Sequence, residues 1–226
     1  MPHLIENTAR AGQKEQHQLS ISMSTSTGSK PTVYIVDDDQ AIRHAMELLM
    51  RSVGLEYRIF HSGDDFLDAY SPDFAGCMVL DIRMPGMGGL ELQQRLMDMD
   101  STLPIIFITG HGDVPMAVKA MQEGAVDFIQ KPFRDQELLD RVQEALATDQ
   151  ERRSERDEQA EIASRMEKLT KREREVMDLV VTGKPNKVIA FDLGVSQRTV
   201  EIHRARVMEK MEARSLAELV RMQLKS

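Results

Sequence analysis

The 226-residue chain has one cysteine, no tryptophan and no apolar run of the roughly 18 residues that a membrane helix requires. The lone Cys77 excludes an internal disulfide, and with six scattered histidines no zinc site is recognisable. The first residues lack the apolar segment and small-residue cleavage site of a secretory signal. We therefore expect a cytoplasmic protein without membrane contact, in which Cys77 is a small buried hydrophobic residue.

The distribution of charge indicates two different halves. The length exceeds the roughly 100–150 residues of a usual domain, so two domains are expected. The net charge is −8, yet residues 164–226 carry 14 basic and 9 acidic side chains. An acidic body followed by a basic segment points to a nucleic-acid contact at the carboxyl-terminal end.

Between residues 31 and 147, short apolar runs alternate with stretches of helical period. The runs are VYIV, YRIF, CMVL, PIIFIT and VDFIQ. Five strands and five helices in strict alternation predict an α/β fold, a parallel sheet with helices on both faces. Residues 1–30 are polar and rich in Ser and Thr, which predicts a disordered leader. Residues 148–163 carry both charge signs, which predicts an exposed helical linker.

Residues 164–226 are predicted to be all helical. Thr170–Glu173 is a capping-box pattern that opens an apolar-periodic helix, and Ser215 opens the last helix in the same way. Between them, a helix that begins at Pro185 is followed by a turn at residues 194–196 and a longer helix capped by Ser196. Two helices joined by a short glycine-containing turn form a helix-turn-helix.

Acidic residues follow two of the predicted strands. Asp37 and Asp38 come after the first strand and Asp81 after the third, at the sheet edge where open α/β folds keep their sites. Carboxylates about 5 Å apart repel by roughly 3 kcal/mol at an effective dielectric near 20, and Mg²⁺ would offset this. Thr109 and Lys131 follow two further strands. An anion at Asp81 would thus contact a metal ion, a hydroxyl and an ammonium. Together these groups stabilise a phosphoryl group during its transfer, and Asp81 would then be the nucleophile.

Each of these residues taken singly has a simpler explanation. An aspartate after a strand is often a turn former or a helix cap, and Asp39 is expected to cap the first helix. Thr109 and Lys131 could be ordinary loop residues, and the Lys131–Pro132 bond could be cis or trans. The prediction depends on their joint placement at strand ends.

The second helix of the helix-turn-helix has two distinct faces. At 100° per residue, its inward side carries Val200, Val207, Met208 and Met211. Its opposite face carries Arg198, Ile202, Ala205 and Arg206, flanked by Glu201 and His203. In a major groove, Arg206 could address guanine, Glu201 cytosine and Ile202 a thymine methyl. The residues better placed for phosphates are Lys187, Arg198 and Thr199. A solvated charged face remains the simpler alternative.

Several motifs together resemble a known family. DDD, LDIRMPGMGG, ITGHGD and DFIQKPF, each at a strand end, resemble a response-regulator receiver domain. SQRTVEIHRARVMEKM resembles the LuxR-type helix-turn-helix, and the chain as a whole is similar to the FixJ branch of the FixJ/NarL family. The resemblance implies a flavodoxin-like receiver with strand order 2-1-3-4-5 over residues 31–147, and a DNA-binding domain over residues 164–226.

The resemblance also implies roles for individual residues. Asp81 would accept a phosphoryl group from a sensor histidine kinase, and Thr109 and Phe128 would form the switch pair. Mg²⁺ would be bound by Asp38 directly, by Asp37 largely through water, and by the backbone carbonyl of Arg83. Phe128 stands where many receivers have tyrosine. As an ordinary core ring it would have no switching role.

The family resemblance predicts a phosphorylation-dependent transcriptional regulator rather than an enzyme, with at most slow self-dephosphorylation. Its expected partners are a sensor histidine kinase, double-stranded DNA, RNA polymerase and a second copy of the chain, bound on phosphorylation through roughly residues 113–146. Two alternatives stay open. One is a Mg²⁺-dependent phosphatase, which would use a second acid two residues beyond Asp81, where Arg83 stands. The other is a regulator that binds DNA without phosphorylation.

Overall fold

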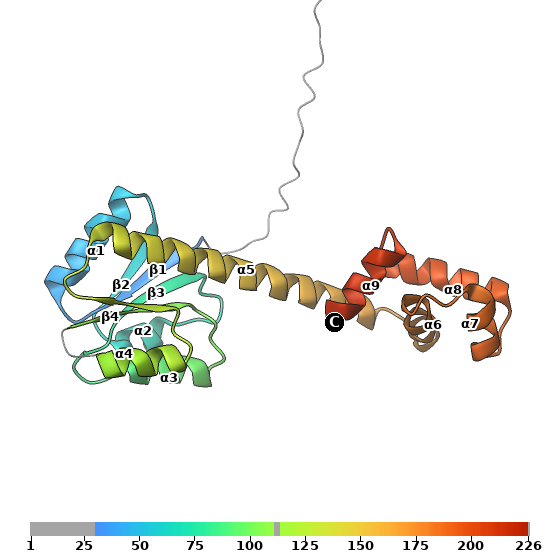
Figure 1. Cartoon of the computed structure of the whole chain (residues 1–226), viewed down its shortest axis with the longest axis horizontal. Coiled ribbons are helices and arrows are strands. Elements are labelled where there is room, and N and C mark those ends of the chain that lie inside the picture. Colours follow the sequence, from blue (N-terminus) through green and yellow to red (C-terminus); the bar gives the residue numbers. More distant parts are fainter. Residues whose placement is uncertain (1–29, 111–113, 226) are drawn as a thin grey trace, which may run out of the picture.

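The structure, a computed structural model, describes residues 30–110 and 114–225. Apart from Lys30, the predicted leader lies outside the described residues, as do residues 111–113 of the ITGHGD motif. Figure 1 shows an α/β unit and a smaller helical unit joined by one long helix. Among the described residues, no helix is both long and apolar enough to cross a bilayer.

The α/β unit is a parallel five-stranded sheet in the order β2-β1-β3-β4-β5, as predicted. Among the described residues of this unit, strands and helices alternate along the chain. The strands are β1 (Thr32–Val36), β2 (Glu56–Phe60), β3 (Gly76–Asp81), β4 (Ile105–Thr109) and β5 (Asp127–Gln130). The helices between them are α1 (Gln40–Ser52), α2 (Gly63–Ala69), α3 (Gly89–Asp98) and α4 (Val114–Gln122).

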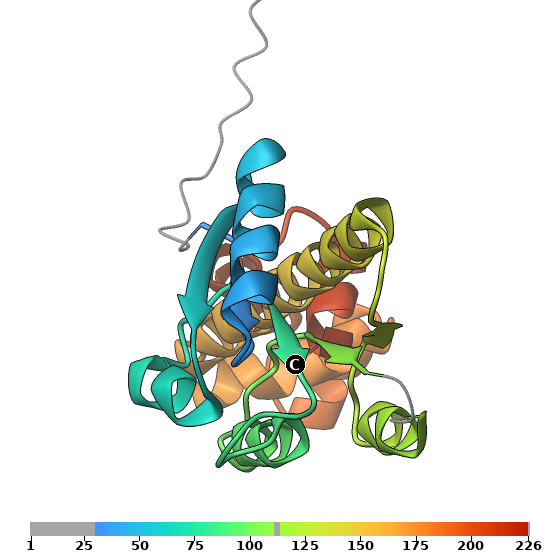
Figure 2. The ribbon, with the colours of Figure 1, turned by 90° about the vertical axis from the view of Figure 1, so that its left-hand side faces the viewer.

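Two apolar layers cover the two faces of the sheet. Because side chains alternate across a strand, β1 sends Tyr34 and Val36 to one face and Val33 and Ile35 to the other. The first face is covered by α2, α3 and α4, and the second by α1 and α5 (Asp135–Glu167). Figure 2 shows these helices on either side of the sheet. Strands buried on both faces explain the uninterrupted apolar runs of the sequence.

Helix α5 continues far beyond the sheet. Its 33 residues include both the last helix predicted for the receiver and the predicted linker, so the expected limits at 147 and 164 fall within one helix and stay predictions. Most side chains from Gln150 to Glu161 are exposed, as expected for a helix that bridges two units through solvent. Asp149 and Ile162 depart from the predicted exposed linker because both are buried.

The carboxyl-terminal unit contains α6 (Lys171–Val181), α7 (Asn186–Leu193), α8 (Gln197–Lys210) and α9 (Leu216–Lys225) around a third apolar cluster. The predicted capping box is present: the Thr170 hydroxyl accepts from the Glu173 N–H, and the Glu173 carboxylate accepts from the Thr170 N–H. The helix predicted to begin at Pro185 is α7. Pro185 is its N-cap, and the first helical residue is Asn186. Ser196 caps α8 as predicted.

Candidate functional site

Three carboxylates meet at the carboxyl-terminal edge of the sheet. Val36 of β1 lies beside Leu80 of β3, so the residues that follow them, Asp37 and Asp81, are neighbours. One oxygen from each of Asp37, Asp38 and Asp81 lies within 4.8 Å of the others. Asp37 is fully buried, Asp81 is nearly so, and Asp38 is exposed. The sequence prediction of an acidic cluster is thus confirmed.

Lys131 supplies the cation within this cluster. Its Nζ donates to Asp37 Oδ2 at 2.9 Å and to Asp81 Oδ1 at 3.0 Å. The side chain reaches inward from the end of β5, where the Lys131 N–H donates to the Thr109 carbonyl at 2.7 Å. The Lys131–Pro132 peptide bond is cis, one of the two alternatives left open by the sequence. One ammonium therefore bridges two carboxylates that would otherwise repel each other without compensation.

The charges in the cluster shift the pKa values of its members. Burial raises the pKa of Asp81 above its ordinary value, the hydrogen bond and charge of Lys131 oppose this rise, and the charges of Asp37 and Asp38 add to it. Burial by itself would lower the pKa of Lys131, but the hydrogen bonds and charges of Asp37 and Asp81 outweigh it and hold the pKa above its ordinary value. Three acids thus share one base, and negative charge remains in excess.

The donor set suits a small, hard divalent cation. Carboxylate oxygens are the ligands that Mg²⁺ prefers, and it usually keeps several waters and one or two carboxylates. Asp38 is exposed, so solvent reaches the cluster beside two buried acids. The residues present therefore fit a magnesium ion.

Thr109 and Phe128 occupy different environments. Thr109 ends β4 and is 3% exposed, and its hydroxyl donates to the Gly110 carbonyl at 3.2 Å. Phe128 of β5 is 40% exposed, so in this structure its ring is not part of the core. Arg83, whose backbone carbonyl the family resemblance implies as a ligand, has an exposed side chain just beyond β3. Thr109 thus lies at the same sheet edge as Asp81, whereas the Phe128 ring faces solvent.

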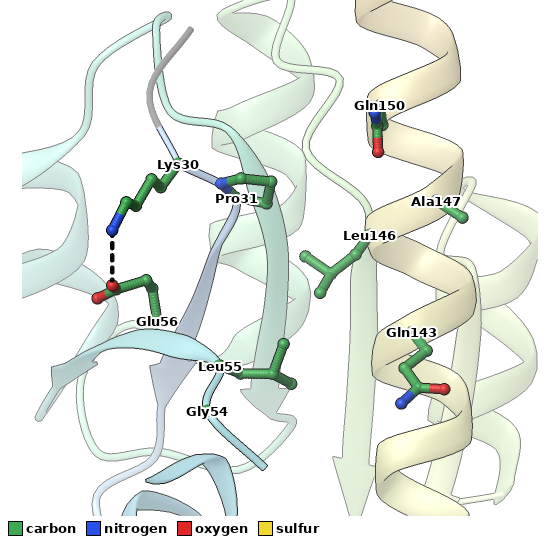
Figure 3. A pocket seen from close by; sticks show the side chains of 9 residues that line it. All are labelled: Lys30, Pro31, Gly54, Leu55, Glu56, Gln143, Leu146, Ala147 and Gln150. Atoms are coloured by element: carbon green, nitrogen blue, oxygen red, sulfur yellow. Dashed lines mark hydrogen bonds and ion pairs between the residues drawn. The ribbon is translucent and has the colours of Figure 1, made fainter. Parts of the chain in front are cut away.

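A pocket of about 500 Å³ lies away from this cluster. It occupies the amino-terminal end of the sheet, between the start of β2 and α5, and Figure 3 shows Leu55 and Leu146 facing it from the two sides. An ion pair between Lys30 and Glu56, 3.5 Å long, borders it. None of the acidic cluster lines this pocket, so it has no part in the chemistry of Asp81.

The helix-turn-helix predicted from the sequence is formed by α7 and α8. Gly194 closes α7 in the left-handed conformation, with φ of 65° and ψ of 35°, which glycine adopts without a Cβ penalty. Val200 and Val207 of α8 are buried in the third cluster. Arg204 Nη1 donates to Asn186 Oδ1 at 3.2 Å, which explains why this arginine lies toward the interior and fixes α8 against the start of α7.

The predicted DNA-contacting residues are not equally accessible. Those with exposed side chains are Lys187, Arg198, Ile202, Ala205 and Arg206. Those that are partly buried are Thr199, Glu201 and His203. Glu201 is paired with Arg198 at 3.6 Å, and Thr199 shares a 2.8 Å hydrogen bond with Ser196. Within the described residues, His203 Nδ1 is buried and has no hydrogen-bond partner, so this side chain turns partly inward.

Comparison with known proteins matches both halves of the chain. Residues 33–143 match the family "Response regulator receiver domain", and residues 167–223 match "Bacterial regulatory proteins, luxR family". The chain is 50% identical over 198 residues to Nodulation protein W of Bradyrhizobium diazoefficiens, covering 88% of this chain and 87% of that protein. It is 46% identical over 194 residues to Transcriptional regulatory protein FixJ of Rhizobium meliloti, covering 85% and 95%.

The chain is a response regulator of the FixJ/NarL family. It combines a receiver with a LuxR-type DNA-binding domain and is a phosphorylation-dependent regulator of transcription. The solved structure of the response regulator StyR is similar, with a TM-score of 0.81, 44% identity and coverage of 88% of this chain and 100% of that one. Full-length FixJ from B. japonicum, at 42% identity and coverage of 87% and 97%, superposes with a TM-score of only 0.55. The superposition with that relative is thus less complete than with StyR.

Two residues at the acidic site of the response regulator were not identified from the sequence. Arg43 of α1 donates from Nη1 to the Asp37 carbonyl at 2.6 Å and so holds the loop that carries the first acids. Gly89 begins α3, where a Cβ would lie 2.4 Å from the Asp81 carbonyl oxygen. The spacing of Arg43, one helical turn beyond the Asp39 cap, is the only sequence signal that could have indicated its position.

Proposed function

We propose that this response regulator receives a phosphoryl group on Asp81 and that the modification changes its dimerisation and its binding to DNA. The observation that carries the proposal is the cluster at the sheet edge, where Lys131 lies within 3.0 Å of both Asp37 and Asp81. The most similar relatives include proteins named as transcriptional regulators, which supports the second half of the proposal.

Asp81 would act as the nucleophile. Its carboxylate oxygen would form a bond to the phosphorus of a phosphohistidine on a sensor kinase, while the bond between that phosphorus and the histidine nitrogen breaks. The developing charge on the phosphoryl oxygens is stabilised by groups already in place. Lys131 exchanges a carboxylate partner for a phosphoryl oxygen, and the Thr109 hydroxyl exchanges the Gly110 carbonyl for another.

We assign the magnesium ligands to Asp37, Asp38, Asp81 and the backbone carbonyl of Arg83. When bound, the ion would supply positive charge that offsets both the carboxylates and the incoming phosphoryl group. Hydrolysis of the phosphorylated residue is expected to be slow, so that the chain acts as a switch and not as an enzyme.

The switch is proposed to move Thr109 toward the phosphoryl group and to turn the Phe128 ring inward. A homodimer would then form through α4, β5 and α5. Exposed apolar side chains on this surface support the proposal: Val118 and Met121 of α4 are 49% and 38% exposed, and Phe128 is 40% exposed. Burial of such groups between two copies would stabilise the dimer.

The DNA-binding half would place α8 in the major groove. Arg206 and Ile202, both exposed, would contact base edges, whereas Lys187 and Arg198 would contact phosphates. A dimer would present two such helices to two half-sites. From DNA the protein would act on RNA polymerase, and it would do so in the cytoplasm.

The decisive experiment is a titration of DNA fragments by gel shift, with and without a small phosphodonor and magnesium. The wild-type protein should gain DNA affinity on phosphorylation, and Asp81→Asn should not. Asp73→Asn, a change of the same kind in the loop before β3, is the matched control and should respond as wild type does. Equal DNA affinity of phosphorylated and unphosphorylated wild type would overturn the proposal.

A further inference from the structure

One acidic residue of the linker portion of α5 is buried although its neighbours in sequence are not. Asp149 is 3% exposed within an otherwise polar and exposed stretch. Its Oδ2 accepts from the Gly76 backbone N–H at 2.7 Å and from Arg153 Nε at 2.9 Å. A buried carboxylate is tolerated only when its hydrogen bonds and charge are satisfied, and here a backbone donor and a guanidinium do both.

Arg153 extends the contact to the same loop of the receiver. Its Nη2 donates to the Phe74 carbonyl, so Asp149 and Arg153, one turn apart on α5, hold both sides of residues 74–76. We call these two residues the linker anchor. In Figure 1 helix α5 can be followed from the sheet to the carboxyl-terminal unit.

The receiver side of the contact is closely packed. The Phe74 ring stacks on the Tyr34 ring of β1, with centroids 4.6 Å apart and planes within 2° of parallel, and the Arg58 guanidinium lies 5.0 Å from its centroid. Gly76 has φ of 128°, and a Cβ there would lie 1.9 Å from the Thr32 carbonyl oxygen. Gly76 also begins β3, the strand that ends at Asp81.

The far end of the same helix is fixed to the DNA-binding half. Arg165 donates from Nη1 to the Met211 carbonyl at 3.2 Å and pairs through Nη2 with Glu212 at 3.0 Å, at the turn that follows α8. Ile162 is buried in the third apolar cluster. The exposed middle of α5 therefore runs between two fixed ends.

We propose that the linker anchor fixes the direction in which α5 leaves the receiver and thereby sets the position of the DNA-binding half relative to the sheet. The receiver family match ends at residue 143, before the anchor, so Asp149 and Arg153 belong to the connection between domains. A second step, which rests on the proposed function, is that the anchor transmits the response to phosphorylation from β3 to α5.

The first test measures geometry and does not depend on phosphorylation. Spin labels are placed on the full chain at two exposed positions, Met99→Cys in the receiver and Glu209→Cys in α8, while the native Cys77 is fully buried. Electron–electron double resonance then gives the distribution of distances between the halves. We expect Asp149→Asn and Arg153→Gln to broaden this distribution at least twofold. Asp149→Asn removes the charge but keeps an acceptor for the Gly76 N–H. Circular dichroism of each variant verifies that the receiver is folded.

Matched controls remove the same charges from exposed positions of the same helix: Asp157→Asn and Arg156→Gln. These should leave the distribution as in wild type. A distribution that is equally narrow in wild type, anchor variants and controls would overturn the proposal, and so would equal broadening in anchor variants and controls.

The second test measures coupling. The ratio of DNA affinities with and without phosphodonor is expected to fall severalfold toward one in the anchor variants, while the yield of phosphorylated Asp81 is unchanged. If the anchor variants show a broadened distance distribution but an undiminished ratio of DNA affinities, the transmission step is refuted. The geometric role of the anchor would still be supported. If phosphorylation does not raise the DNA affinity of the wild-type protein, the proposed function fails. The distance measurement then still tests whether the anchor fixes the position of the DNA-binding half.

Discussion

Replacement of Lys131 by methionine tests the electrostatics of the acidic site most directly. The change removes an ammonium that lies 2.9 Å from Asp37 and 3.0 Å from Asp81 and keeps most of the apolar stem. At an effective dielectric near 20, one such contact amounts to roughly 5 kcal/mol of Coulomb energy. The net loss is smaller because part of the cost of desolvating the lysine is regained, and breaking a buried pair typically destabilises by about 3–5 kcal/mol.

The exposure of Lys131 reduces this figure. Its side chain is 24% exposed, so solvent screens part of the interaction, and we expect a loss of about 2–3 kcal/mol of the free energy of unfolding of the receiver. With a urea dependence of about 1–3 kcal/mol per molar, the midpoint should fall by about 0.7–3 M. Magnesium should restore part of this loss, because a divalent cation among the three carboxylates replaces the missing charge.

Tyrosine fluorescence during urea unfolding of the full chain is the appropriate assay. The chain has three tyrosines and no tryptophan, and Tyr34, Tyr57 and Tyr70 all belong to the receiver, so the signal does not report on the DNA-binding half. Lys119→Met, at a lysine that is 61% exposed on α4, is the matched control and should shift the midpoint little. An unchanged midpoint in Lys131→Met, or a loss that magnesium does not reduce, would refute the reasoning.

Three further predictions concern the switch, the DNA surface and the packing of the second half. Thr109→Ala should still be phosphorylated, as seen by phosphate-affinity electrophoresis, but should lose most of the gain in DNA affinity; a full gain would contradict the switch role. Lys187→Ala should weaken binding to all DNA sequences and reduce the slope of log affinity against log salt concentration by about 1. Arg206→Ala should weaken the binding free energy by about 1–3 kcal/mol and relax the selectivity of the protein at one base pair. The hydrogen bond from Lys210 lowers the pKa of Glu173 from 4.5 to about 2, so the stability contributed by this carboxylate is complete above about pH 4.5 and is lost as the pH falls toward 2. In Glu173→Gln the urea midpoint followed by circular dichroism should be lower at neutral pH, and the gap to wild type should close over that range; a gap independent of pH would contradict the assignment.

The acidic cluster could be predicted from the sequence because it depends on topology alone. Alternating apolar runs and helical stretches specify a parallel sheet, and in such a sheet the residues that follow neighbouring strands lie at one edge. Asp37 comes directly after β1 and Asp81 is the last residue of β3, which leaves little freedom in their placement. The caps at Asp39, Thr170 and Ser196 were equally predictable, since a cap depends on residues within one helical turn.

Contacts between side chains far apart in the sequence were decided only by the tertiary structure. Asp149 lies in a charged stretch that any local pattern assigns to solvent, and its burial depends on the loop at residues 74–76, more than seventy residues earlier in the chain. His203 turns partly inward because of the packing around α8, and local period alone placed it beside the exposed face. Local periodicity thus determines the elements, their order and the sheet edge on which acids gather. The partners of each charge depend on how long side chains cross the space between elements, which no short-range pattern encodes.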